Sequence, residues 1–515
     1  MKTINDVRSF IKQSEADKIV EEIKGKLMKS GEMPVYSDIY KEENGVKYQY
    51  VNYVQEGGGV LGVALAGYTY VLEKLGFRFL KLAGTSAGAI NTMMIASISK
   101  ENYPELKNEK IETQSELILL ELLNKDLWDL VDGSKFGKWL IKLAITNKSR
   151  LKFIIGVIKW SVIYILIYAV FCAIEWYFKI VMYPEVEQGI NGVAFGAVTL
   201  LIIILITTVY YLFRFKRAHF GLNKGDDFYD WMKNILHRNN INNTADLDKA
   251  MESRFEGLTL RSSPLRTSGL ESTTKITPPF ITIIASDITN QLKVEFPRMA
   301  KDYYTSERLN EISPACYVRA SMSIPVFFAP FRVTVDEKVI EQSNLQHKGL
   351  VATQYSQLKV LKEKIKAYEV HFVDGGVLSN FPISVFHNEA IKIPRMPSFG
   401  AKLEDEKHAA AEEIEEKRLS FFPLLYRIFN TVRFNYDKDF LRKNAVYEQC
   451  IGHIDVADYN WLDFGLDDET KIAMFKRGAE AAKTFLLGGN VWVKGRQKEF
   501  DAFNWEKFKE ERSSM

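Results

Sequence analysis

The sequence predicts an α/β fold with a mainly parallel central sheet and an inserted hairpin of two apolar helices. The first observation is that a strand-like run, a glycine-rich turn and a helix-like run follow one another twice between residues 47 and 98. Such alternation is typical of parallel strands joined by crossover helices. The second observation is a pair of long apolar segments between residues 160 and 213, which interrupts this pattern.

The two strand–turn–helix repeats set the expected core of the fold. Residues 47–54, KYQYVNYV, are rich in tyrosine and valine and favour a strand, which leads through glycines into a helix over residues 60–75. Residues 77–83 are strand-like again, and residues 87–98 have the composition of a helix. The second turn carries Ser86.

The rest of the chain is expected to complete the same fold. Strands are predicted at residues 280–285 and 369–373, and helices at 226–236, 246–251 and 402–418. Residues 332–368 are predicted to be an excursion with a charged helix.

These expectations give five regions. They are a helical leader (1–46), the first part of the α/β domain (47–145), the hairpin (146–218), the second part of that domain (219–492) and a polar C-terminal tail (493–515).

Composition excludes several classes of function. The net charge of +3 over 515 residues gives no argument for nucleic-acid binding. The three cysteines, Cys172, Cys316 and Cys450, have neither a disulfide pattern nor metal-ligand spacing, which favours a reducing compartment. We therefore expect neither a metal nor a cofactor.

The apolar segments predict two membrane spans. Residues 192–213 contain no charge and are long enough to cross a hydrocarbon core of about 30 Å. Residues 160–182 are a weaker span because they contain Glu175 and Lys179, which can pair on one helix face. Lysines and arginines flank the pair but are absent from the connector, which predicts that both ends are cytosolic. A buried core helix or a re-entrant segment is the alternative for each span.

The pentapeptide GTSAG, from Gly84 to Gly88, suggests a nucleophile. A serine on a tight strand-to-helix turn exposes its oxygen, and glycines remove the side chains that would clash there. Serine is also a common helix N-cap, so Ser86 needs partners before the motif indicates catalysis.

The hexapeptide GGGVLG, residues 57–62, has two interpretations. It fits a dinucleotide-binding fingerprint, and it also fits an oxyanion hole made of backbone N–H groups. A dinucleotide site needs an acidic residue at the end of the next strand, where this chain has Gly84 and Ser86. The oxyanion hole is therefore favoured.

A serine nucleophile needs a base, and Asp374 is the candidate. It ends a predicted strand and is followed by Gly375 and Gly376, which leave access to its carboxylate. An ordinary turn aspartate is the alternative.

The ordered set GGGVLG, GTSAG and VDGGVLSNFP, which spans residues 373–382, resembles the patatin-like phospholipases. The resemblance covers roughly residues 50–130 and 220–490, on both sides of the hairpin. It implies a three-layer α/β/α fold and a lipid acyl hydrolase that releases fatty acid and lysolipid from membrane glycerolipids.

The resemblance also implies roles for single residues. Ser86 would be the nucleophile, Asp374 the base, and no histidine would be needed. Backbone N–H groups of Gly58 and Gly59, within the run that includes Gly57 and Gly62, would form the oxyanion hole. This chain has Leu61 where the family commonly has a basic residue.

A dyad of Ser86 and Asp374 also constrains the hairpin, because Ser86 precedes both spans and Asp374 follows them. A shared site requires two crossings or none, which favours the weaker first span as transmembrane. With two crossings, the flanking charges place the catalytic domain and both termini on the cytoplasmic side.

Two further hypotheses stay open at this point. One is an esterase with a Ser–Asp–His triad, for which His387, His408 and His453 follow Asp374 in the required order. The other is a membrane scaffold or nucleotide-binding protein that uses GGGVLG without catalysis.

Overall fold

The computed structural model describes residues 2–28, 31–131, 220–262, 276–336, 339, 367–406, 431, 433 and 435–514, with isolated positions between 167 and 217. The chain divides into two compact units. The first comprises Met1–Val131, Gly225–Pro325 and Pro330–Met515, and the second comprises Asp132–Lys224 and Val326–Ala329.

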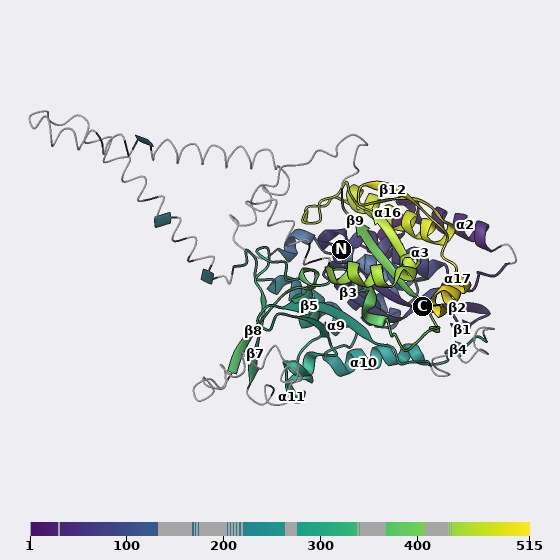
Figure 1. Cartoon of the computed structure of the whole chain (residues 1–515), viewed down its shortest axis with the longest axis horizontal. Helices are drawn as coiled ribbons and strands as arrows, with labels where there is room; N and C mark the ends of the chain where they lie inside the picture. Colours follow the sequence, from purple (N-terminus) through teal and green to yellow (C-terminus); the bar gives the residue numbers. More distant parts are fainter. Residues whose placement is uncertain are drawn as a thin grey trace, which may run out of the picture. The chain divides into compact units, whose positions relative to one another are not determined.

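A mixed sheet forms the centre of the first unit (Figure 1), with the strand order β10-β9-β2-β3-β5-β8-β7. The five strands from β10 to β5 in this order pair in parallel, as the alternation of strands and helices predicted. These parallel strands are β2 (Val46–Gln55), β3 (Phe77–Thr85), β5 (Ile281–Asp287), β9 (Ser398–Glu404) and β10 (Ile451–Asp455).

Antiparallel strands extend the sheet beyond β5 and along the start of β2. β8 (Ala367–Asp374) pairs with β5 and with β7 (Phe331–Asp336), while β6 (Leu292–Phe296) pairs with β5. β1 (Ile39–Glu43) pairs with β2 and with the short β4 (Thr259–Leu260). The predicted excursion over 332–368 thus begins and ends in the paired strands β7 and β8, and most of its middle lies outside the described residues.

Two helices follow the two glycine-rich turns. α3 (Gly62–Lys74) joins β2 to β3, and α4 (Ala87–Ser97) begins directly after Ser86 and packs on β2, β3 and β5. Nearly every residue of α3 is buried, because α3 lies between the sheet and α16 (Asp468–Leu487). A Cβ at Gly478 would come within 1.9 Å of the Ala64 carbonyl oxygen, so these two helices cross at very close range.

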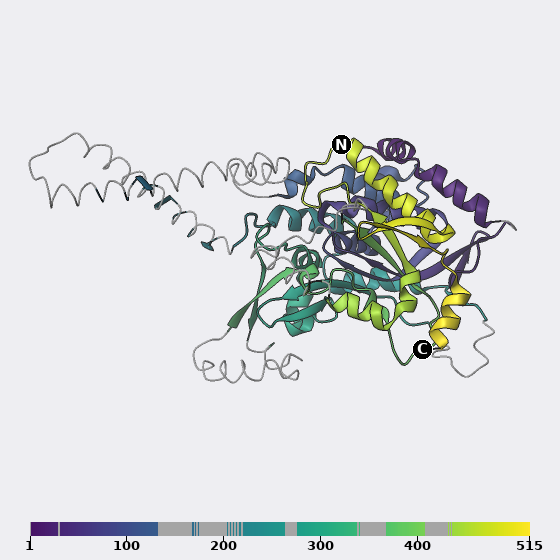
Figure 2. The same cartoon turned by 45° about the horizontal axis from the view of Figure 1, so that its top comes forward.

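The other helices of the first unit are shorter or peripheral. They are α1 (Ile4–Gln13), α2 (Ala16–Leu27), α5 (Gln114–Leu123), α9 (Asp226–Arg238), α10 (Thr244–Glu252), α11 (Ser306–Leu309), α12 (Ala315–Ser321) and α17 (Trp505–Ser513). In Figure 2 the helix of residues 435–443 and α17 lie on the side of the sheet opposite α16.

Both chain ends depart from the expected leader and tail. The leader is not helical throughout, because β1 occupies Ile39–Glu43 and pairs with β2. The C-terminal region folds as β11 (Gly489–Val493), β12 (Arg496–Phe500) and α17. Lys509 is buried and its Nζ lies 3.4 Å from Asp38 Oδ1, so the polar composition conceals a packed element.

Two further predictions fall mostly on residues that the structure does not describe. Residues 402–404 of the predicted helix over 402–418 belong to β9, and most of the remainder lies outside the described residues. The predicted spans, 160–182 and 192–213, also lie outside them except for isolated helical positions. Within the described part of the chain, no helix is both long enough and apolar enough to cross a membrane.

Candidate active site

The register of three strands brings Ser86 and Asp374 together. Thr85, the last residue of β3, pairs with Ile284 of β5, and Asp374, the last residue of β8, pairs with Ala285. The two candidate residues therefore stand on either side of β5 at the same level of the sheet, although they are far apart in the sequence.

Ser86 has the strained backbone expected of a nucleophile on a sharp turn. Its φ of 51° and ψ of −116° are unusual for a residue with a side chain. Close packing requires the flanking glycines, since a Cβ at Gly88 would approach the Gln55 carbonyl oxygen to 2.3 Å and one at Gly84 would approach Gly88 to 2.4 Å. The Ser86 N–H donates to Ser321 Oγ at 2.9 Å, which holds the turn in place.

Asp374 is buried and weakly solvated. Burial raises the pKa of its carboxyl to about 6, and the Ser86 hydroxyl, the Gly376 N–H and the charge of Arg433 oppose this rise. Oδ1 accepts the Gly376 N–H at 2.7 Å, whereas Oδ2 has no hydrogen-bond partner of good geometry. The Ser86 hydroxyl is thus close to the carboxyl but not yet well aligned, which is common before a substrate binds.

The glycine loop, residues 57–62, lies directly against Ser86. A Cβ at Gly57 would come within 3.1 Å of Ser86 Cβ. The Gly57 N–H donates to the Asn380 carbonyl oxygen and the Gly62 N–H donates to that of Gly59, so both are occupied. The N–H groups of Gly58 and Gly59 have no acceptor among the described residues. These two N–H groups are therefore the ones available to an oxyanion.

A second loop, residues 374–381, carries Asp374 and is called here the Asp374 loop. A Cβ at Gly375 would come within 2.2 Å of the Ile284 carbonyl oxygen, so the loop passes tightly over β5. Asp437 accepts the Ser379 hydroxyl at 2.7 Å and the Phe381 N–H at 2.8 Å. Burial raises the pKa of Asp437 to about 6.

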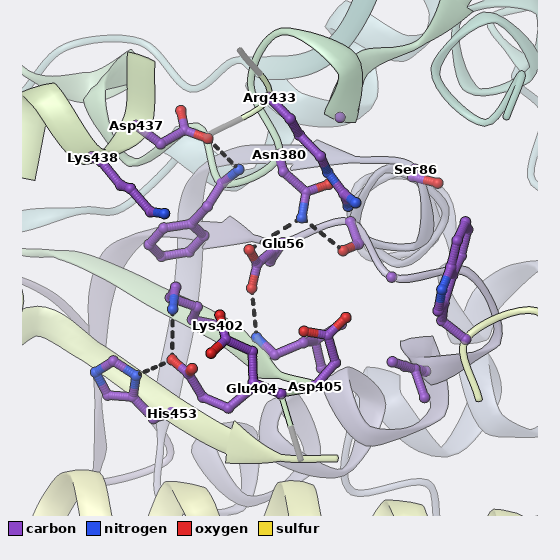
Figure 3. A pocket seen from close by; sticks show the side chains of 18 of the residues that line it. Glu56, Ser86, Asn380, Lys402, Glu404, Asp405, Arg433, Asp437, Lys438 and His453 are labelled. Atoms are coloured by element: carbon purple, nitrogen blue, oxygen red, sulfur yellow. Dashed lines mark hydrogen bonds and ion pairs between the residues drawn. The ribbon is translucent and has the colours of Figure 1, made fainter. Parts of the chain in front are cut away.

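Ser86, Asp374, Gly376 and residues 57–59 line one cavity of about 580 Å³ (Figure 3). It lies beyond the carboxyl ends of β2, β3 and β9, where open α/β sheets bind their ligands. Apolar side chains line part of its wall, among them Leu61, Ile324, Val377, Leu403, Leu441 and Trp461. A cavity of this kind suits an acyl chain beside a small polar centre.

The other end of the same cavity is charged. Lys402 Nζ lies 2.5 Å and His453 Nδ1 lies 2.8 Å from Glu404 Oε1. Burial raises the pKa of Glu404, but the His453 hydrogen bond and the Lys402 charge outweigh it and lower the pKa to about 2. Glu404 is thus held as a carboxylate by its neighbours.

His387 and His453, the described histidines of the proposed triad, have hydrogen-bond partners other than Ser86 and Asp374. His453 contacts Glu404, and His387 Nδ1 lies 2.9 Å from the Tyr447 hydroxyl. His408 lies outside the described residues. No described histidine is among the groups that hydrogen-bond Asp374 or shift its pKa. Within the described ranges there is also no cluster of three His, Cys, Asp or Glu residues that could hold a metal.

Sequence reasoning missed many polar residues of the cavity, among them Glu56, Asn380, Arg433 and Asp437. Asn380 stands within the motif that contains Asp374, and Glu56 directly precedes the glycine loop, so proximity to a motif was an available signal. Nothing local marks Arg433 or Asp437, which reach the cavity from a segment beyond residue 430.

The chain is similar to several known proteins. The family model described as "Patatin-like phospholipase" matches residues 54–387. The uncharacterized protein YqhO of Bacillus subtilis (strain 168) is 25% identical over 440 residues, which cover 85% of this chain and 98% of YqhO. The crystal structure of VipD from Legionella pneumophila aligns with a TM-score of 0.33 at 13% identity, over 93% of this chain and 74% of VipD. The family match spans more than half of the chain, and the protein therefore belongs to the patatin-like phospholipases.

Proposed function

We propose that the protein is a membrane-anchored lipid acyl hydrolase that cleaves carboxylic esters of glycerolipids through an acyl-Ser86 intermediate. The observation that carries the proposal is the shared cavity, in which Ser86, Asp374 and two available N–H groups come together. Family membership supports the same class of reaction.

The geometry supports a specific order of proton transfers. Asp374 takes the hydroxyl proton of Ser86 as Ser86 Oγ bonds to the ester carbonyl carbon, and the N–H groups of Gly58 and Gly59 stabilise the oxyanion. The intermediate expels the alcohol, which takes the proton from Asp374 and leaves as lysolipid. Asp374 then deprotonates a water that attacks the acyl-enzyme, and it returns that proton to Ser86 Oγ as the acyl bond breaks and the fatty acid departs.

The pKa of Asp374 favours this role. A carboxylate of ordinary pKa is a weak base toward an alcohol. Burial raises the pKa of Asp374 to about 6, which strengthens it as a base while it stays ionised at neutral pH. The oxyanion hole supplies further stabilisation, typically about 3 kcal/mol for each donor.

The membrane anchor rests on a separate observation. The large apolar residues described within the predicted hairpin are helical and mostly exposed: Ile167, Val170, Ile174, Ile203, Ile206, Tyr210 and Phe213, at 49% to 64% exposure. Exposed large apolar side chains on a helix suit a lipid environment. Because Ser86 and Asp374 share a cavity, we infer two crossings and a cytosolic catalytic domain.

The decisive experiment is lipid mass spectrometry of vesicles of bacterial phospholipids incubated with the full-length protein. We expect fatty acid and lysolipid from the wild type and from the exposed control Ser253→Ala, and neither product from Ser86→Ala. Intact lipid with folded wild type would reject the hydrolase. For the anchor, replacement of residues 160–213 by a short Gly/Ser linker should release the protein from carbonate-washed membranes, and retention would contradict it.

A further inference from the structure

Glu56 is a buried carboxyl at the start of the glycine loop that the reaction above does not use. It lies in the wall of the cavity (Figure 3) and is 3% exposed. Its Oε1 accepts the Asn380 side-chain N–H at 3.1 Å, and its Oε2 accepts the Leu403 backbone N–H at 2.7 Å. Glu56 therefore connects the glycine loop, the Asp374 loop and β9.

Asn380 holds the two loops against each other. The side-chain Nδ2 of Asn380 donates to the Gly57 carbonyl oxygen at 3.0 Å, and the backbone carbonyl oxygen of Asn380 accepts the Gly57 N–H at 3.0 Å. Its Oδ1 lies where a Cβ at Gly57 or Gly376 would approach to 2.6 or 2.5 Å. Any shift of the Asn380 side chain therefore changes how the oxyanion donors stand relative to Asp374.

Both hydrogen-bond partners of Glu56 are donors, so the carboxylate form of Glu56 suits this position. A carboxylate accepts from both, whereas a protonated carboxyl points an O–H at one of them. The Leu403 N–H is fixed in the sheet, so the contact with the Asn380 side chain is the one that protonation weakens.

We propose that Glu56 and Asn380 are positioning residues that couple the glycine loop to the Asp374 loop, and that this coupling requires the carboxylate form of Glu56. The inference rests on the function proposed above. It adds a regulatory property to that site: catalysis should fall when Glu56 takes up a proton.

The surroundings of Glu56 set the pH at which this occurs. Burial raises the pKa of Glu56 to about 7, and the charges of Glu404 and Asp405 add to the rise. The charge of Lys402 and the Leu403 N–H oppose it. Lys402, Glu404 and Asp405 all belong to the end of β9 and the residue after it, while the Asp374 loop contributes the neutral Asn380.

The test is the pH profile of kcat on a soluble short-chain ester, measured with full-length protein in detergent micelles. For the wild type we expect an acid limb near pH 7, set by Glu56. Glu56→Gln preserves the shape of the side chain but points an N–H at a donor, so the hydrogen bond to that donor is lost. We therefore expect kcat to fall roughly 10- to 100-fold with little change in KM. Its remaining acid limb should move toward pH 6, where Asp374 titrates.

Two further variants make the test specific. Asn380→Asp faces Glu56 with a second carboxylate and should move the acid limb above that of the wild type. Glu73→Gln is the matched control, because Glu73 is another buried glutamate of raised pKa that accepts two hydrogen bonds but does not line the cavity. It should leave the limb in place.

The outcomes separate this inference from the proposed function. Absence of Ser86-dependent hydrolysis in the wild type would overturn both. An active wild type whose acid limb stays unmoved in Glu56→Gln and Asn380→Asp would overturn the coupling alone, because a merely structural residue changes the rate or stability without moving the limb. If Glu56→Gln fails to fold, the upward shift in Asn380→Asp decides the question.

Discussion

The two ends of the cavity hold carboxyl groups that are buried to a similar extent but whose pKa values are shifted in opposite directions. Asp374 is 7% exposed and Glu404 is 5% exposed. The pKa of Asp374 is raised to about 6 by burial, while that of Glu404 is lowered to about 2 because His453 and Lys402 outweigh burial. Burial alone therefore does not distinguish a base from a structural anion, whereas the partners of each carboxylate do.

The comparison predicts opposite consequences when each carboxylate is neutralised. Asp374→Asn removes the only proposed base, so kcat should fall roughly 10³-fold or more while the fold persists. Glu404→Gln leaves the half-buried Lys402 without its ion-pair partner, which should lower the free energy of unfolding by about 3 kcal/mol. Kinetics of ester cleavage per folded molecule, together with urea unfolding, measure both effects.

The exposed control Asp501→Asn should change neither quantity. The comparison breaks if Glu404→Gln stays folded but loses turnover as completely as Asp374→Asn, because the charged end would then take part in the chemistry.

The glycine loop allows a sharper contrast between neighbouring positions. Gly59 has a φ of +56°, and its Cβ would lie 2.1 Å from the Trp461 carbonyl oxygen, so Gly59→Ala must displace backbone. Gly58 has an extended φ of −171°, and its Cβ would clash with the end of the Leu403 side chain and otherwise make ordinary contacts with Leu61. We expect Gly59→Ala to lower kcat roughly 10²-fold and Gly58→Ala to lower kcat only about tenfold.

Burst kinetics with a chromogenic ester would separate acylation from binding in both variants. Equal losses at the two positions would show that the added methyl groups act through their volume alone, and not through displacement of an oxyanion donor.

Local patterns in the sequence predicted the centre of the fold and the dyad. Glycine turns between strand-like and helix-like runs marked Ser86 and the glycine loop, and the DGG motif marked Asp374. Each of these signals depends on a few adjacent residues whose conformation the local sequence determines.

Non-local packing accounts for what the sequence did not predict. The Lys402–Glu404–His453 cluster exists because β10 lies beside β9, a neighbour relation that no local pattern encodes. Lys509 belongs to a polar segment, but Asp38, from the opposite end of the chain, makes its burial possible. β1 was missed because three of its five residues, Lys41, Glu42 and Glu43, are charged.

The smallest expected effect is a difference in how stability depends on pH. The folded pKa of Asp374 is raised from 3.8 to about 6, so its contribution to stability is complete below about pH 3.8 and is lost as pH rises through 6. The folded pKa of Glu404 is lowered from 4.5 to about 2, so its contribution is present above pH 4.5 and is lost as pH falls toward 2.

Asp374→Asn should therefore be more stable than the wild type at pH 8, by on the order of 1 to 3 kcal/mol, and the gain should vanish near pH 4. Glu404→Gln should show the reverse, with a deficit at pH 8 that narrows toward pH 3. Urea midpoints of the three proteins across this pH range measure both differences. A deficit for Asp374→Asn at pH 8 would mean that its carboxylate stabilises the fold, and the contrast between the two ends of the cavity would disappear.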